Sequence, residues 1–259
     1  MPRIITQNGY AIGYEEAGSD EAMPIVFLHG VGSDKSVWRR QLRFFGPVRR
    51  AVAFDYPGYG DSDPAPAGTT RDDYASALIS GMDELGIARA HVCGLSLGGV
   101  AAIALHHADP KRCASLILAD SFAAHPDGAA IYERSMAASN DLRAMAEARV
   151  DTLLGQPADP SVRQEVVETM ARIDPAAYRI GAEAVWLADQ ADRAAAIRVP
   201  TLVLCGSEDK VTPPELSIAL ADLIPGARLE IIAGAGHISN LEQPGRFNEV
   251  VEEFIQSLA

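Results

Sequence analysis

The chain has 259 residues, of which 48% are hydrophobic, so it is long enough for one large core and an inserted segment. Its formal net charge of −13, without any run of lysines and arginines, argues against binding to nucleic acid or to an anionic membrane surface. There is no basic stretch followed by an apolar run at the amino end and no run of about 18 apolar residues, which predicts a cytoplasmic protein without a membrane span.

Apolar, β-branched runs alternate with segments of helical periodicity, which predicts a mainly parallel sheet with helices on both faces. We predict eight strands, near residues 4–6, 10–16, 25–28, 50–54, 90–93, 114–119, 201–205 and 228–232. The helices expected to cover this sheet lie near residues 37–45, 72–85, 97–108, 214–223 and 245–258. Asn8-Gly9, between the first two strands, is a hairpin signal, so these strands are expected to form an antiparallel edge.

The third predicted strand ends in His29-Gly30-Val31-Gly32, whose glycines allow backbone amides to turn toward a ligand. The fifth strand ends in Gly94-Leu95-Ser96-Leu97-Gly98, directly before an alanine-rich helix. This pattern between a strand and a helix is typical of a nucleophile elbow, a tight turn that exposes a serine hydroxyl. Because that hydroxyl is a poor nucleophile at neutral pH, it needs a base and amide donors for the developing oxyanion.

Candidates for the base and for an orienting acid follow later in the chain. Asp120 directly follows the sixth strand, Asp209 lies in the loop after the seventh, and His237 lies in a glycine-rich loop after the eighth. The order serine, acid, histidine favours Asp209 as the acid, and Asp120 is the alternative.

Residues 122–197 interrupt the alternation of strands and helices. They show helical spacing with breaks at Gly155-Gln156-Pro157, Asp159-Pro160 and Asp174-Pro175, which predicts several short helices. We expect a cap over Ser96 made of residues 122–197, on a core made of residues 1–121 and 198–259; the alternative is a set of helices packed at the side. A cap excludes water and supplies substrate contacts.

Trp186 in this interval is predicted to bind substrate, although it is equally suited to anchoring the cap to the core. If the substrate is an acid, an arginine of the interval is expected to pair with its carboxylate. The candidates are Arg134, Arg143, Arg149, Arg172, Arg179 and Arg193.

At the elbow Gly94–Gly98, in the loops of Asp209 and His237 and at the turn after the third strand, the chain resembles the α/β-hydrolase superfamily of serine hydrolases. The resemblance extends over nearly the whole length and includes the loop Phe54-Asp-Tyr-Pro-Gly-Tyr-Gly-Asp-Ser62, which is similar to that family's segment after the fourth strand. It implies an α/β-hydrolase fold, in which an eight-stranded, mostly parallel sheet carries helices on both faces and a helical cap inserted after strand six.

The resemblance also implies roles for individual residues. Ser96 is the expected nucleophile, His237 the general base and then acid, and Asp209 the orienting acid. The backbone amides of Val31 and Leu97 are the expected oxyanion hole. No metal and no organic cofactor is expected.

Within the superfamily, the segments 94–99, 119–121 and 197–201 are similar to 3-oxoadipate enol-lactonases and related small bacterial carboxylesterases. This implies a small-molecule ester or enol-lactone as substrate. Val150-Asp-Thr-Leu-Leu154 stands where those lactonases have Trp-Phe-Thr, so a general esterase stays open. A hydrolase of carbon–carbon bonds in ring-cleavage dienones and a binding protein that retains the hydrolase site are the further alternatives.

Overall fold

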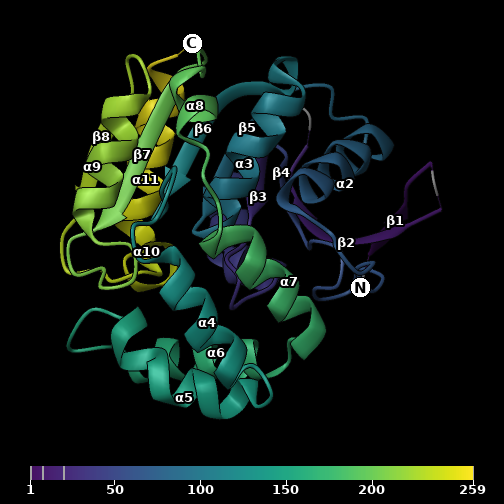
Figure 1. Cartoon of the computed structure of the whole chain (residues 1–259). Helices are drawn as coiled ribbons and strands as arrows, with labels where there is room; N and C mark the ends of the chain where they lie inside the picture. Colours follow the sequence, from purple (N-terminus) through teal and green to yellow (C-terminus); the bar gives the residue numbers. More distant parts are fainter. Residues whose placement is uncertain (1, 8, 20, 259) are drawn as a thin grey trace.

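The computed structural model describes residues 2–7, 9–19 and 21–258. Its sheet has eight strands in the order β1-β2-β4-β3-β5-β6-β7-β8 (Figure 1). β2 pairs antiparallel with β1 and β4, and the other neighbours are parallel. The strands are β1 Arg3–Ile5, β2 Ala11–Ala17, β3 Ile25–Leu28, β4 Ala51–Phe54, β5 Ala90–Leu95, β6 Cys113–Ala119, β7 Thr201–Gly206 and β8 Arg228–Ile232.

All eight predicted strands are therefore confirmed, with ends that differ from the prediction by at most two residues. The antiparallel edge is confirmed as well, because Arg3 lies opposite Gly13 and Ile5 opposite Ala11. Asn8, on which the hairpin signal partly rested, lies outside the described residues.

Both faces of the central strands are buried, and alternate residues of one strand belong to different faces. In β3, Val26 and Leu28 belong to one hydrophobic cluster and Ile25 and Phe27 to the other, and all four side chains are fully buried. A parallel strand covered on both sides has this continuous apolar sequence. Each such side chain contributes about 1.5–3 kcal/mol when it is fully buried.

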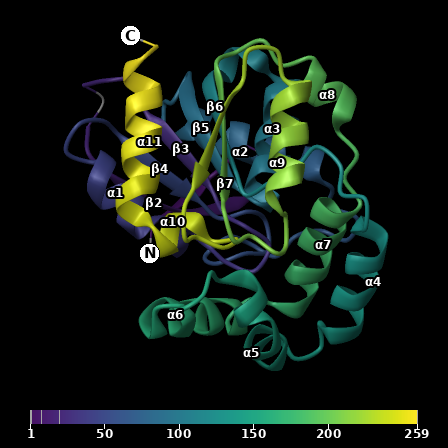
Figure 2. The same ribbon diagram turned by 90° about the vertical axis from the view of Figure 1, so that its left-hand side faces the viewer.

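Helices cover the two faces in the predicted arrangement, as the view of Figure 2 shows. The helices on one face are α2 Arg71–Glu84, α3 Leu97–Ala108 and α9 Pro214–Leu223, and those on the other are α1 Arg39–Phe45 and α11 Pro244–Gln256. The helix predicted over residues 37–45 consists of two parts, a 3-10 turn over Lys35–Trp38 and then α1. The 3-10 turn is the tighter first turn of this helix, and the Asp34 side chain caps it by accepting the amide of Ser36.

Five helices stand between β6 and β7 and form the segment that we call the insertion, residues 122–197. They are α4 Gly128–Ala138, α5 Leu142–Leu153, α6 Pro160–Ala171, α7 Pro175–Trp186 and α8 Ala191–Ala195. Two of the predicted breaks start helices: Asp159 and Asp174 accept hydrogen bonds from the first turns of α6 and α7, and a proline occupies the first helical position of each.

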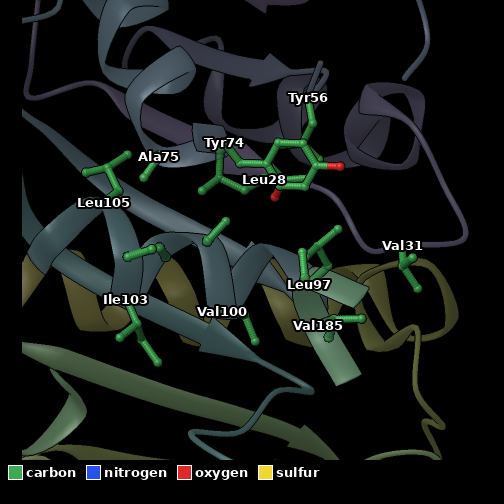
Figure 3. Close-up of a cluster of buried hydrophobic side chains, with 14 of the residues drawn as sticks. Leu28, Val31, Tyr56, Tyr74, Ala75, Leu97, Val100, Ile103, Leu105 and Val185 are labelled. Atoms are coloured by element: carbon green, nitrogen blue, oxygen red, sulfur yellow. The ribbon is translucent and has the colours of Figure 1, made fainter. Parts of the chain in front are cut away.

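Helices α4 to α7 of the insertion pack at the end of the sheet where β5 leads into α3, whereas α8 lies at the other end and packs beside α3 and α9 of the core. Figures 1 and 2 both show α4 to α7 gathered at one end of the sheet. In Figure 3, Val185 of α7 lies beside Leu97 and Val100 of α3, and all three belong to one hydrophobic cluster. None of the described helices is both long and apolar enough to cross a bilayer.

Candidate active site

Ser96 lies at the turn between β5 and α3 in a backbone conformation that few residues adopt. Its φ of 55° and ψ of −114° are strained for a residue with a Cβ, at a cost of about 1–3 kcal/mol. The Ser96 amide donates to the Ala119 carbonyl (2.9 Å), and Ser121 Oγ donates to the Ser96 carbonyl (2.9 Å). A Cβ on Gly94 would lie 2.1 Å from the Gly98 carbonyl oxygen, so the strand and the helix approach this closely only with glycine there.

The Ser96 side chain borders a small cavity. Ser96 is 2% exposed, and its Oγ makes no hydrogen bond with any described residue. The cavity has a volume of about 50 Å³, and both Ser96 and His237 line it. Serine–histidine hydrogen bonds often tighten only when substrate binds, so this hydroxyl is available to a ligand and to a base.

His237 and Asp209, which are 28 residues apart, are in direct contact. His237 Nδ1 lies 2.8 Å from Asp209 Oδ2, and Asp209 Oδ1 accepts the amides of Val211 (2.8 Å) and Thr212 (2.9 Å). An ionised carboxylate only accepts hydrogen bonds, so the proton is assigned to Nδ1 and Nε2 is left as the acceptor.

The charges of this pair stabilise each other. Burial raises the pKa of Asp209, but the neighbouring His237 and the hydrogen bonds to the carboxylate outweigh it and hold the pKa below its ordinary value. Burial lowers the pKa of His237, but the Asp209 carboxylate outweighs this effect and raises the pKa. Asp209 is thus placed to stabilise a protonated imidazole.

Thr212 is a site residue that sequence reasoning missed. Its Oγ1 donates to Asp209 Oδ2 (2.6 Å) and lies 3.1 Å from His237 Nδ1. Aspartate side chains often accept hydrogen bonds from nearby backbone amides, as Asp209 does from Val211 and Thr212, so this local pattern was an available signal for Thr212.

Glu242 was also missed, and it fixes the loop that carries the histidine. Its Oε1 accepts the amides of Gly236 (3.0 Å) and Ile238 (3.2 Å), on either side of His237, and its Oε2 accepts the Gly155 amide (2.7 Å). The carboxylate therefore ties the histidine loop to the segment that follows α5. No local sequence pattern signals this contact, because Gly155 and Glu242 are 87 residues apart.

Asp120, the alternative acid, lies near the pair but has other partners. Its Oδ1 accepts the Gly206 amide (2.8 Å) and its Oδ2 accepts Ser239 Oγ (2.5 Å). Burial, aided by the charge of Asp209, raises the pKa of Asp120 to about 8. Burial thus favours the neutral form of Asp120 at neutral pH, and Asp209 is the carboxylate that contacts His237.

The loop after β3 is held by buried hydrogen bonds. His29 Nδ1 bonds with the Gly30 carbonyl (2.8 Å), and Tyr59 Oη donates to the Val31 carbonyl (3.3 Å). Burial lowers the pKa of His29 to about 4, so this imidazole stays neutral and supports the loop. Val31 lines the cavity, and Leu97 is the first residue of α3, whose amide has no acceptor within its helix.

Trp186 lines the same cavity and also packs on the core. It is 2% exposed and stacks on Phe122 with ring centroids 5.9 Å apart. Its Nε1 makes no hydrogen bond with any described residue. The two roles considered for Trp186 from sequence are therefore structurally compatible.

One group of side chains among the described residues has ligand-type atoms close enough to share a metal ion. Atoms of Asp120, Cys205 and Asp209 lie within 4.8 Å of one another. The oxygens of Asp120 and Asp209 already accept hydrogen bonds from the protein, and burial raises the pKa of the Cys205 thiol well above its ordinary value. This chemistry suits a hydrogen-bonded network better than a metal centre.

The sequence profile of the Alpha/beta hydrolase family matches residues 25–250. The chain belongs to this family. This hydrolase is 28% identical over 259 residues to 3-oxoadipate enol-lactonase 1 of Acinetobacter baylyi, with 98% of this chain and 97% of that protein covered. It is 31% identical over 270 residues to 2-hydroxymuconate semialdehyde hydrolase of Pseudomonas sp. strain CF600, with 98% and 93% covered. The solved structure of a thermophilic esterase from Thermogutta terrifontis superposes with a TM-score of 0.90 at 26% identity, covering 99% of this chain and 98% of that one.

Proposed function

We propose that this alpha/beta hydrolase cleaves a small carboxylic ester or enol-lactone through an acyl-enzyme on Ser96. One observation carries the proposal: Ser96, strained and with an unbonded hydroxyl, shares a small cavity with His237, whose Nδ1 contacts Asp209. A nucleophile, a base and an orienting acid are the groups that acyl transfer needs. An enol-lactonase and an esterase among the similar proteins support this type of bond.

The proposed reaction has two halves. Ser96 Oγ attacks the carbonyl carbon while its proton passes to His237 Nε2, and the Asp209 carboxylate stabilises the imidazolium. The amides of Val31 and Leu97 donate to the oxyanion. The imidazolium then protonates the leaving oxygen as the carbon–oxygen bond breaks. In the second half, a water molecule gives a proton to His237 and attacks the acyl carbon, and Ser96 recovers its proton as the acid departs. This sequence of steps needs no metal or organic cofactor.

We also propose that the insertion, residues 122–197, acts as a cap on the core formed by residues 1–121 and 198–259. The support is the lining of the cavity, in which Trp186 of the insertion lies with Ser96 of the core. Binding sites for drug-sized ligands commonly have volumes of about 300–1,000 Å³. A cavity of about 50 Å³ favours a small group around the reacting carbonyl, with Trp186 among its contacts.

Hydrolysis of a carbon–carbon bond is the second candidate function. The observation that favours it is the 31% identity to a 2-hydroxymuconate semialdehyde hydrolase. The same three side chains serve this reaction, so the substrate distinguishes the two candidates.

A panel of three substrates tests the proposal: p-nitrophenyl acetate, 3-oxoadipate enol-lactone and a ring-cleavage dienone. We expect turnover of the ester or the lactone, and a loss of several orders of magnitude in the Ser96→Ala variant with its fold intact by circular dichroism. Turnover of the dienone alone would favour the carbon–carbon hydrolase. If the wild type turns over none of the three and no fluorophosphonate labels Ser96, the proposal is wrong and a binding role takes its place.

A further inference from the structure

A second hollow, with a volume of about 370 Å³, lies beside the active-site cavity. It is bordered by α4, α5 and the loop after β7. Arg149 of α5 and Val211 of the loop line both spaces, so the hollow and the cavity adjoin at these two side chains.

The charge around this hollow is of one sign. Arg134, Arg149 and Lys210 line it, and no acidic side chain is among the described residues that do so. In the part of the chain that the structure describes, none of the three forms an ion pair. This stands out in a chain with 35 acidic and 22 basic residues.

The other arginines of the insertion are already paired. Arg163 of α6 belongs to this group as well. Carboxylates hold Arg143 through Glu168, Arg163 through Asp151, Arg172 through Asp34 and Arg193 through Asp72, while Arg179 donates to Ser139 and Asn140. Arg134 and Arg149 are thus the two that face a hollow without an acidic partner.

Arg149 differs from a solvated surface arginine. It is half-buried, and its Nη1 donates to the hydroxyl of Tyr178 (3.3 Å), a fully buried residue that also lines the cavity. A guanidinium has five donors in a fixed fork, and a carboxylate or a phosphate can accept from two of them at once; of these two groups, a carboxylate is the one that a carboxylic ester or lactone commonly carries.

We infer that Arg149, assisted by Arg134 and Lys210, binds the carboxylate of an anionic ester or lactone whose reacting carbonyl lies at Ser96. The inference rests on the proposed function of Ser96. The apolar part of the substrate lies in the cavity, which Leu153 and other apolar side chains line, and its anion lies in the basic hollow. The basic hollow then selects substrates that carry a negative charge at one end, and the cavity selects those with a small reacting group at the other end.

Two esters of similar size, one anionic and one neutral, test this subsite: mono-p-nitrophenyl adipate and methyl p-nitrophenyl adipate. We expect the wild type to prefer the monoanion in kcat/KM. Arg149→Met keeps an apolar stem and removes the charge, and it should lower kcat/KM for the monoanion about 10–150-fold more than for the methyl ester. Arg149→Lys, which retains the charge without the fork, should retain part of the preference.

Arg143→Met is the matched control, since Arg143 lies on the same helix and pairs with Glu168. We expect this variant to leave both rates unchanged. Lys210→Met should weaken the preference less than Arg149→Met does, because Lys210 is exposed and its charge is screened by salt.

The outcomes separate this inference from the proposed function. If the wild type hydrolyses both esters through Ser96 but Arg149→Met changes the two rates equally or not at all, the anion subsite is wrong and the hydrolase proposal stands. If the wild type hydrolyses neither ester and Ser96 is not labelled by a fluorophosphonate, the proposed function fails, and this inference fails with it.

Discussion

Replacement of Asp209 by asparagine tests how His237 is held. Asn Oδ1 can still accept the amides of Val211 and Thr212, so the loop is expected to keep its shape. The asparagine nitrogen replaces the oxygen that lies 2.8 Å from His237 Nδ1, and it is a donor that needs an acceptor on the imidazole. His237 would then carry its proton on Nε2 and be unable to accept one from Ser96.

In serine hydrolases that lose the orienting carboxylate in this way, the wrong tautomer lowers kcat by about 10⁴-fold. That factor corresponds to about 5.5 kcal/mol of transition-state stabilisation. We expect a fall of this size in kcat for Asp209→Asn, measured with p-nitrophenyl acetate, with a native circular dichroism spectrum.

Asp120→Asn is the matched control for this substitution. Because the pKa of Asp120 is about 8, its side chain is already neutral at pH 7, and asparagine has nearly the same shape. We expect a loss of less than about tenfold, or about 1.4 kcal/mol. A larger loss in Asp120→Asn than in Asp209→Asn would move the orienting acid to Asp120. Retention of more than about a tenth of the wild-type kcat by Asp209→Asn would refute the reasoning.

Three further predictions concern His237, Gly98 and Asp120. His237 must be neutral to accept a proton, and the Asp209 carboxylate raises its pKa. We therefore expect kcat/KM to fall at acidic pH with a midpoint above the ordinary histidine value of 6.5. A midpoint below 6.5 would contradict the contact with Asp209. Gly98→Ala would place a Cβ 2.1 Å from a carbonyl oxygen at the end of β3, so the free energy of unfolding in urea should fall by about 1–3 kcal/mol. Gly245→Ala is the control, because a Cβ there would have nothing within 4 Å, and it should show no such loss. Equal effects of the two substitutions would refute the close approach at Gly98. Burial raises the pKa of Asp120 from its ordinary 3.8 to about 8, so the stability of the wild type decreases as the pH rises between these values. The Tm of Asp120→Asn relative to that of the wild type should therefore rise from about pH 4 to about pH 8. A difference in Tm that stays constant over this range would contradict the raised pKa.

The features that the sequence predicts well are local or periodic. The central strands β3 to β7 are mostly apolar runs of the right length, and the breaks before α6 and α7 are Asp-Pro pairs whose capping chemistry acts within three residues. Ser96 was found from its turn, because the glycines that permit the close approach of β5 and α3 lie within two residues of it.

Contacts between residues that are far apart in the chain could not be predicted from the sequence, because they depend on the folded structure. Glu242 reaches Gly155 only because the histidine loop and the end of α5 meet in space, and the neutral state of Asp120 depends on burial and on the neighbouring charge of Asp209. Arg149 could be selected as the carboxylate-binding arginine only once the structure showed which arginines of the insertion pair with other side chains. The cytoplasmic location and the identity of the substrate stay predictions.

The most direct test of the central claim is the site of covalent labelling by a fluorophosphonate. The reagent should form one adduct with the active chain, and peptide mass spectrometry should place it on Ser96, because this serine combines an unbonded hydroxyl with a neighbouring histidine in one cavity. Ser96→Ala should take up no label under the same conditions. An adduct on another residue with Ser96 unmodified, in a chain that hydrolyses p-nitrophenyl acetate, would contradict the account.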